Sequence, residues 1–315
     1  MRFTVVGAGA LGTILSVHLA AAGHEVRTVA RGARAEMLRA RGMNLYGLRN
    51  AHIPCVPAIS LSRDENNGVI IYAVKTYHME HVLEAAQNIS CDAVFSVANG
   101  VEKKDQLAKF FPRDKILGCM ANFSGELEED GRVHFTRNVC LYLGGGDVDT
   151  AKSIASVLQD SGLNTEYSSR IESVEWSKFV GWLAFFVIAV TSRSATGSFL
   201  MTRPLAKAVV TIIKECSKVA EAVGISLEDH SPMPVKSIAQ IPIEDGIEQV
   251  QKIGREFDSV APGHRMSSLQ DLEAGRELEV EGTLGYMVRK ATEYGIETPS
   301  LSFAYDLASG LNDLS

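Results

Sequence analysis

The sequence lacks the features that mark several large classes of protein. Its five cysteines, at 55, 91, 119, 140 and 216, form no C-x-x-C pair and stand far apart. This spacing argues against a disulfide framework or a zinc site and favours reduced thiols in a cytoplasmic protein. Met1 is not followed by a basic segment and a long apolar run, so we expect no secretory leader. The longest uncharged stretch, Phe179 to Ser192, is well short of the roughly 20 residues of a spanning helix. We predict a buried helix there and no membrane partner.

An excess of positive charge is also absent. The formal net charge is −7, with Lys and Arg scattered through the chain. Binding to a phosphate backbone requires a basic stripe, so we expect no nucleic-acid partner. His78 and His81 have a spacing that can bind metal on a helix, but no third ligand lies nearby in the sequence, and we expect no metal site.

The first half of the chain alternates short β-branched runs with helical segments. The runs are Arg2–Gly7, Leu11–Ala22, Glu25–Arg31, Arg34–Arg41, Val69–Val74, Tyr77–Asn88 and Ala93–Val97. This alternation is typical of a parallel sheet with crossover helices. Later apolar runs at Ile116–Phe123, Val133–Phe135 and Val139–Leu143 predict strands that extend the same sheet, partly antiparallel, before a last helix and strand near 150–167.

The second half of the chain has helical spacing and no convincing strand. The helical segments are Ile171–Val190, Leu205–Val223, His264–Gly275 and Gly282–Tyr294. Between them, Pro232, Pro234, Pro242 and Pro262 predict short helices and turns rather than one long element. The 315 residues are enough for two domains. We therefore predict an α/β domain with a mostly parallel sheet at 1–168 and an all-α domain at 169–315.

A glycine-rich turn follows the first predicted strand directly and opens a helix. It reads Gly7-Ala8-Gly9-Ala10-Leu11-Gly12. Strand, turn, helix and second strand fit within about 30 residues, the context in which this pattern binds a dinucleotide in a Rossmann fold. Gly7 allows the tight turn, Gly9 lets a pyrophosphate approach the backbone, and Gly12 permits close packing of helix on strand. Free N–H groups at the helix start bind the anion. All six residues are therefore predicted cofactor ligands.

The end of the second predicted strand carries an arginine instead of a carboxylate. An NAD site usually has Asp or Glu about 20 residues after the turn, whereas this chain has Arg31, with Arg34 close behind. Guanidinium groups form charge-assisted hydrogen bonds with phosphate, which favours the 2′-phosphate of NADP. Two solvated arginines at a helix start are the alternative.

Further motifs occur in a fixed order along nearly the whole chain. They are Val74-Lys75, Asn99-Gly100, Trp176-x-Lys178, Ser267-Ser268-Leu269-Gln270-Asp271 leading to Arg276 and Glu279, and Gly295-Ile296-Glu297-Thr298-Pro299. Together with the glycine turn they make the chain similar to the ketopantoate reductases, also called 2-dehydropantoate 2-reductases, which serve pantothenate biosynthesis.

The resemblance implies NADPH-dependent reduction of a 2-keto acid between a Rossmann domain and a helical domain that also forms a homodimer. Lys178 would be the catalytic acid and Glu279 its partner. Ser267 would contact the substrate carboxylate, while Lys75 and Asn99 would line the nicotinamide and substrate site. The chemistry agrees, because hydride delivery to a ketone builds negative charge on its oxygen, which an ammonium group can stabilise and protonate.

The chain departs from the family pattern where the substrate is recognised. Asparagines expected one and two turns after the catalytic lysine are Trp182 and Phe186 here, on the same predicted helix face as Lys178. Thr196, Leu278 and Leu284 also replace polar residues common in the family. Aromatic side chains in a pocket favour binding of apolar substrate groups and leave a substrate hydroxyl without a hydrogen-bond partner. We therefore predict a 2-keto acid or ketone more apolar than ketopantoate, unless Trp182 and Phe186 only pack a core.

Two other functions stay open from the sequence. The lost asparagines would suit a non-catalytic NADP-binding sensor or regulatory protein, although retained Lys178 and Glu279 argue against it. An NAD-dependent 2-hydroxy acid dehydrogenase is opposed chiefly by Arg31. Ketopantoate itself also remains a possible substrate.

Overall fold

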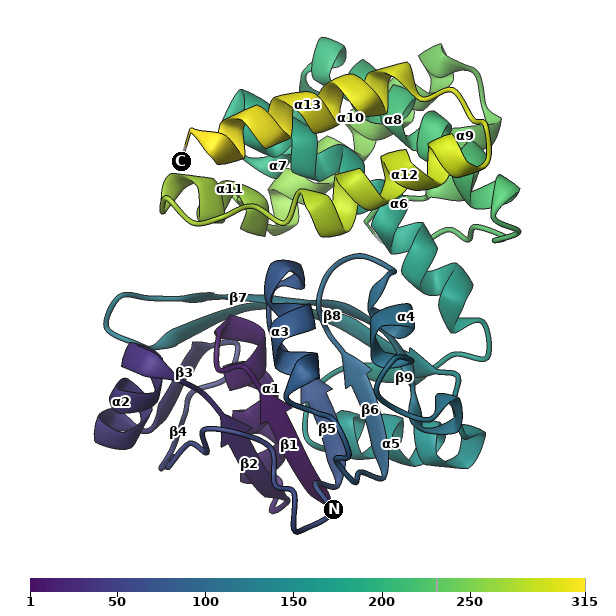
Figure 1. The fold of residues 1–315 in the computed structure, drawn as a ribbon. Helices are drawn as coiled ribbons and strands as arrows, with labels where there is room; N and C mark the ends of the chain where they lie inside the picture. Colours follow the sequence, from purple (N-terminus) through teal and green to yellow (C-terminus); the bar gives the residue numbers. More distant parts are fainter. Residues whose placement is uncertain (231, 315) are drawn as a thin grey trace. The chain divides into compact units, whose positions relative to one another are not determined.

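The computed structural model describes residues 1–230 and 232–314 of the chain. It contains two compact units, Met1–Ile171 and a second that begins at Glu172 (Figure 1). The first unit is α/β, and every element assigned in the described part of the second is a helix. This confirms the predicted fold class, a Rossmann-type α/β domain with a parallel sheet followed by an all-α domain.

The first unit is built on a four-stranded parallel sheet. Its strands lie in the order β2-β1-β5-β6, with bounds β1 Arg2–Val6, β2 Glu25–Val29, β5 Val69–Tyr72 and β6 Ala93–Ser96. The crossover helices are α1 Ala10–Ala21, α2 Gly32–Arg41 and α3 Thr76–Glu84. Parallel strands need such crossover connections, so the alternating strands and helices predicted from the sequence correspond to the strands and helices of this sheet.

Both faces of this sheet are buried, because side chains alternate along each strand. Along β5, Val69 and Ile71 join the core formed with α1, whereas Ile70 and Tyr72 join the core that includes Met79 of α3. The second core also contains residues around the short helix α4 Lys103–Leu107. The glycine turn after β1 is thus anchored on a sheet that is packed on both sides.

The later strands form a second sheet, so the prediction that they extend the first one is wrong. β7 Gly118–Leu127 and β8 Val133–Gly144 are antiparallel, and β8 also pairs in parallel with β3 Met43–Gly47 and β9 Thr165–Tyr167. β3 and its partner β4 Ala51–Ile53 were missed as strands. The pairing of β3 with β8 joins segments far apart in sequence, which local periodicity cannot reveal. The 3₁₀ helix η1 Arg113–Lys115 and helix α5 Val148–Asp160 complete the unit.

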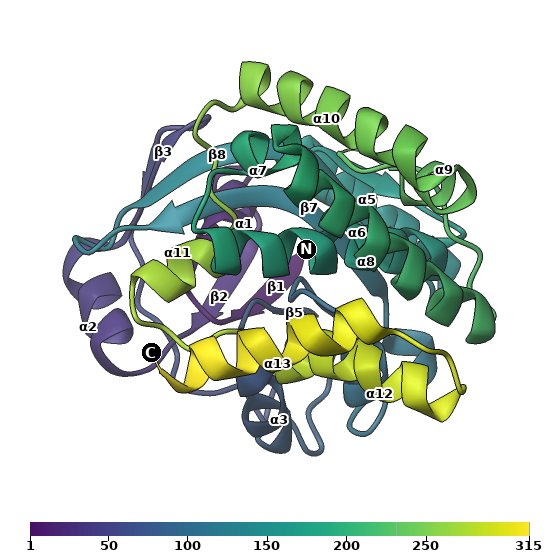
Figure 2. The same cartoon turned by 90° about the horizontal axis from the view of Figure 1, so that it is seen from above.

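The second unit consists of helices packed around α6 Ile171–Ser192. The others are α7 Thr196–Met201, α8 Arg203–Ala222, α9 Val235–Gln240, α10 Ile243–Val260, α11 Ser267–Glu273, η2 Glu281–Gly285, α12 Tyr286–Glu293 and α13 Pro299–Asp313. Figure 2 shows α10 running along α7 and α8. The expectation of only short helices among the prolines is wrong, because Pro242 caps α10 and Pro262 follows its end. These prolines bound a long helix and do not interrupt it.

Helix α6 is the core helix of the second unit. By length and composition it could cross a membrane, but 89% of its most apolar window is buried in the structure. A helix that is apolar on all sides is buried in the core of a large fold or in a bilayer. Here Val180, Leu183 and Ala184 are fully enclosed, as the sequence prediction of a buried helix required.

Candidate active site

The glycine turn has the geometry that a dinucleotide site needs. Gly7 has φ +103°, and a Cβ there would lie 2.6 Å from the carbonyl oxygen of Ala73. A Cβ on Gly12 would lie 2.0 Å from the oxygen of Gly7, so helix α1 packs tightly on the turn. Around Gly9, at the start of α1, a Cβ would meet nothing within 4 Å. The backbone is therefore open where a pyrophosphate would approach, and these residues fit the cofactor.

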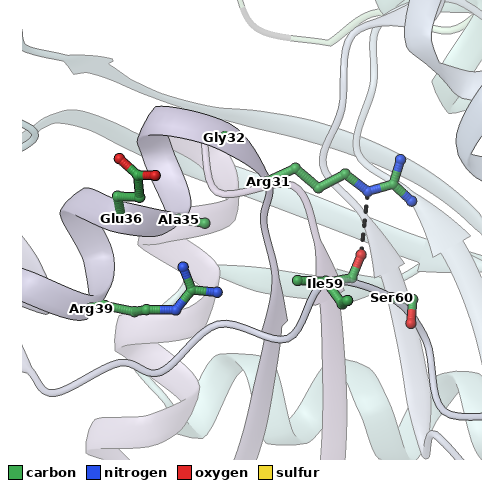
Figure 3. Close-up of a pocket in the computed structure, with 7 residues that line it drawn as sticks. All are labelled: Arg31, Gly32, Ala35, Glu36, Arg39, Ile59 and Ser60. Carbon is green, nitrogen blue, oxygen red and sulfur yellow. Dashed lines mark hydrogen bonds between the residues drawn. The ribbon is translucent and has the colours of Figure 1, made fainter.

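Arg31 lies at the end of β2, beside an open pocket of about 480 Å³ (Figure 3). Its Nε donates to the carbonyl oxygen of Ile59 at 3.2 Å, and its Nη1 is 3.2 Å from Nε2 of His81. Arg39 and Ser60 also line the pocket. The Arg31 guanidinium is exposed and held at its base by the Ile59 bond, an arrangement that fits a phosphate at this strand end.

Arg34 does not face this pocket, so its predicted share in binding the 2′-phosphate is wrong. Its Nε, Nη1 and Nη2 donate to Ala8 O, Gly131 O and Thr13 Oγ1. Burial lowers the pKa of Arg34, although an arginine stays charged in a protein. All three guanidinium nitrogens are thus engaged with oxygen atoms of the fold.

Lys75 and Asn99 lie at the same edge of the parallel sheet as the glycine turn. Lys75 is the N-cap residue of α3, just after β5, and Asn99 follows β6. β1, β5 and β6 are neighbours, and their carboxyl ends share one edge. Both side chains are half-buried. Ligands bind at this edge in open α/β sheets, so the placement suits the predicted contacts with a nicotinamide.

The helix α6 carries Lys178, Trp182 and Phe186 in successive turns. Lys178 and Trp182 are half-buried, whereas Phe186 is 1% exposed. The rings of Trp182 and Phe186 have centroids 5.2 Å apart and planes inclined by 38°. An ammonium and two aromatic rings in tilted contact therefore follow one another along α6, with the Trp182 ring partly exposed and the Phe186 ring buried.

Glu279 is 5% exposed and lies two positions before a turn of π-helix, η2, whose N-cap residue is Val280. In that turn the Gly285 N–H donates to the Val280 carbonyl five residues back, at 3.0 Å. π-Helical turns are rare and occur frequently at functional sites. The aromatic ring of Tyr286, which follows the turn, lies 6.3 Å from the ring of Trp176 on α6. The segment after Glu279 thus packs against the part of α6 that carries Lys178.

Ser267 is exposed as the first residue of α11, while the next residue, Ser268, is 3% exposed. The Ser268 hydroxyl has no hydrogen-bond partner among the residues that the structure describes. The loop before α11 is attached to Thr196, whose Oγ1 lies 3.0 Å from Nδ1 of His264. Thr196 therefore replaces the family's asparagine with a residue that supports this loop.

Sequence reasoning missed a buried cation next to Asn99. Lys103 is 7% exposed, and its Nζ donates to the carbonyl oxygens of Ala98 and Cys119. It joins the end of β6 to the start of β7. The sequence offered no signal for this role, because Lys103 stands in a polar run that is typical of a solvated helix.

No group of three His, Cys, Asp or Glu residues that could hold a metal ion occurs within residues 1–230 and 232–314. His78 is exposed, and His81 contacts Arg31 as described above.

Comparison with known families covers both units. Residues 3–147 match the model described as "Ketopantoate reductase PanE/ApbA", and residues 170–312 match its C-terminal counterpart. A 2-dehydropantoate 2-reductase of Archaeoglobus fulgidus is 29% identical over 299 residues, covering 94% of this chain and 92% of the relative. The enzyme of the same name from Lactococcus lactis is 25% identical, covering 100% of this chain and 99% of the relative.

Solved structures share the fold along the whole chain. A PanE/ApbA family ketopantoate reductase from Ralstonia eutropha superposes with a TM-score of 0.84 at 21% identity, covering 100% of this chain and 99% of the other. D-Mandelate dehydrogenase with NADH and anilino(oxo)acetate superposes with a TM-score of 0.85 at 22% identity and the same coverage. With both family models matched in order over most of its length, this chain belongs to the ketopantoate reductase family.

Proposed function

We propose that this protein reduces a 2-keto acid more apolar than ketopantoate, using NADPH, with Lys178 as the proton donor. The observation that carries the proposal is the face of α6. It keeps the family's lysine and replaces the two following asparagines with two aromatic rings in contact, Trp182 and Phe186. In this proposal the proton donor, Lys178, is retained, whereas the two amides that would bind a substrate hydroxyl are replaced.

Lys178 would stabilise and protonate the substrate oxygen as negative charge develops there. A carboxylate in a buried position requires a compensating partner, and we propose that Glu279 orients the Lys178 ammonium and keeps it charged. The ring contact between Trp176 and Tyr286 supports this pairing, since each ring lies on the segment that carries one of the two residues. Ser267 and Asn99 would supply polar contacts to the substrate.

The proposed substrate class follows from the apolar surface of the Trp182 ring. Its half-buried ring offers apolar surface and an N–H donor on α6, one turn from Lys178. A hydroxyl placed against the apolar face of this ring would lose its hydrogen bonds with water and gain none. The solved D-mandelate dehydrogenase holds anilino(oxo)acetate, an oxoacetate with an aromatic group, on the same fold. That ligand supports an aromatic or branched keto acid as the class to test first.

We propose NADP as the cofactor, held by the glycine turn, Lys75 and Asn99, with Arg31 at the 2′-phosphate. When bound, the dinucleotide supplies the hydride. The exposed guanidinium of Arg31 and the second arginine in its pocket, Arg39, favour a dianionic phosphate over a neutral ribose hydroxyl. The competing function, an NAD-dependent 2-hydroxy acid dehydrogenase, is favoured by the NADH bound in the D-mandelate dehydrogenase structures.

One experiment separates these functions. Oxidation of NADPH and of NADH is followed with 2-keto acids that range from small hydroxylated to large aromatic ones. We expect NADPH and branched or aromatic keto acids to give the highest kcat/KM. Preference for ketopantoate, or for NADH, would refute the corresponding part of the proposal, and absence of turnover with all of them would favour the non-catalytic reading. The homodimer and the cytoplasmic location stay predictions.

A further inference from the structure

One charged side chain of the first unit is bonded to three separate parts of the fold. Arg34 lies in the first turn of α2 and donates from Nε to Ala8 O at 2.8 Å, from Nη2 to Thr13 Oγ1 at 3.0 Å, and from Nη1 to Gly131 O at 2.9 Å. Ala8 belongs to the glycine turn, Thr13 to α1, and Gly131 to the turn between β7 and β8. Ala8 and Thr13 are buried, so the contacts of Arg34 with these two residues lie beneath the glycine turn.

The bond to Ala8 O matters because of the peptide that it belongs to. The carbonyl of Ala8 and the N–H of Gly9 form one planar trans peptide and point in opposite directions. A donor that holds the oxygen therefore also sets the direction of the Gly9 N–H. Thr13 Oγ1 donates to the same oxygen at 3.3 Å, so two donors converge on it. A Cβ placed on Gly9 would have no heavy atom within 4 Å, so a pyrophosphate has room to approach this residue.

We propose that Arg34 is a positioning residue of the dinucleotide site, which holds the Ala8–Gly9 peptide so that the Gly9 N–H faces the bound pyrophosphate. It acts through the turn and touches neither the 2′-phosphate nor the substrate. The inference rests on the proposed function only in requiring a dinucleotide at the turn. The proposal gives different roles to two arginines three positions apart. Arg31 would select between the cofactors, and Arg34 would support the binding of both cofactors equally.

The chain offers a matched control on the same helix. Arg41 is exposed and donates from Nη1 to Asp130 O at 3.1 Å, so it ties α2 to the same β7–β8 turn. Within residues 1–230 and 232–314, no side-chain hydrogen bond of Arg41 reaches the glycine turn. Arg41→Met thus removes an arginine that links the same two elements without disturbing Ala8.

The test measures dissociation constants by titration calorimetry for NADPH, NADH and 2′-AMP, which has the 2′-phosphate but no pyrophosphate. We expect Arg34→Met to weaken NADPH and NADH by a similar factor of about tenfold or more, the scale of losing charge-assisted bonds. Binding of 2′-AMP should stay as in the wild type. Arg34→Lys, which can still donate to Ala8 O, should recover part of the loss, and Arg41→Met should change none of the three.

Several results would overturn the inference. Unchanged dinucleotide binding in Arg34→Met would show that Arg34 does not position the turn. A loss confined to NADPH would make Arg34 a ligand of the 2′-phosphate. An equal loss of 2′-AMP binding would make Arg34 a phosphate ligand or a general support of the fold. If thermal melting shows that Arg34→Met is not folded, Thr13→Val serves instead. It keeps the side-chain shape and removes one of the oxygens that hold Arg34, and it should weaken both dinucleotides equally, with selective or absent loss refuting the inference.

Turnover distinguishes this inference from the proposed function. A wild type that binds both dinucleotides but reduces no keto acid refutes the reductase and leaves the Arg34 result standing. A wild type that binds neither dinucleotide refutes both.

Discussion

The rings of Trp182 and Phe186 contact each other along α6 with centroids 5.2 Å apart and planes inclined by 38°, the Trp182 ring half-buried and the Phe186 ring enclosed. This pair replaces two amides of the family pattern one and two turns after Lys178. The half-exposed ring is the one that can meet a ligand, while Phe186 supports it from within. The earlier alternative, that both rings only pack a core, therefore applies more to Phe186 than to Trp182.

Substitution of Trp182 should shift substrate preference. We expect Trp182→Asn, alone and with Phe186→Asn, to raise kcat/KM for ketopantoate relative to an aromatic keto acid by about tenfold to a hundredfold. This is the range of about 1–3 kcal/mol for a buried polar group that gains its bond.

Phe186→Leu is the control for lost packing, since removal of a buried ring by itself costs stability. It should lower the melting temperature without changing the preference order. An unchanged order in Trp182→Asn and in the double variant would leave core packing as the only role of the two rings.

Removal of the ammonium at position 178 should affect the chemical step. Lys178→Ala is expected to lower kcat by at least about a hundredfold, the scale of a lost general acid, while the dissociation constant of NADPH stays unchanged. Glu279→Gln should also lower kcat. Lys218→Ala, at an exposed position of α8, is the control for loss of one positive charge. Near-normal kcat in Lys178→Ala at saturating substrate would show that another group donates the proton.

Arg31 should decide between the two cofactors. Arg31→Ala is expected to weaken NADPH by about tenfold to a hundredfold, the range for hydrogen bonds to a charged group, and to change NADH little. Calorimetric titration of both cofactors checks this. Arg27→Ala is the matched control, because Arg27 lies on β2, the strand that Arg31 follows, and pairs with Glu65 at the surface. Equal losses for NADPH and NADH would contradict the assignment.

His18 should make the stability of the first unit depend on pH. Burial lowers the pKa of His18, with Arg49 contributing in the same direction, although a contact with the Ser161 carbonyl at 2.9 Å partly opposes it. In the unfolded chain the imidazole takes up a proton near pH 6.5, whereas in the fold it does so only at lower pH. The free energy of unfolding therefore falls as the pH decreases below about 6.5.

Urea unfolding between pH 7.5 and 5.5 measures this effect. His18→Gln should show a shallower decrease than the wild type, by at most about 1.4 kcal/mol per pH unit, the limit for one proton. Parallel pH profiles for the two proteins would mean that His18 contributes nothing to the acid sensitivity.

The amino-acid sequence by itself determined the features that depend on near neighbours. The spacing from the first strand through the glycine turn to β2 predicted the dinucleotide turn, and Gly7 and Gly9 have the backbone geometry and open space expected of them. Helical spacing predicted α8, because burial of one face repeats within a few residues, and a long uncharged run predicted the buried helix α6. The family and the fold class were also evident from motifs in a fixed order.

Only the tertiary structure decided which distant segments meet. The pairing of β3 with β8 creates a second sheet, and Arg34 reaches Gly131, 97 positions away, instead of a phosphate. Lys103 is buried because two backbone carbonyls, Ala98 O just after β6 and Cys119 O on β7, converge on its ammonium. Such contacts leave no periodic trace in the sequence, since the partner of a charged side chain is set by the packing of elements and not by its neighbours along the chain.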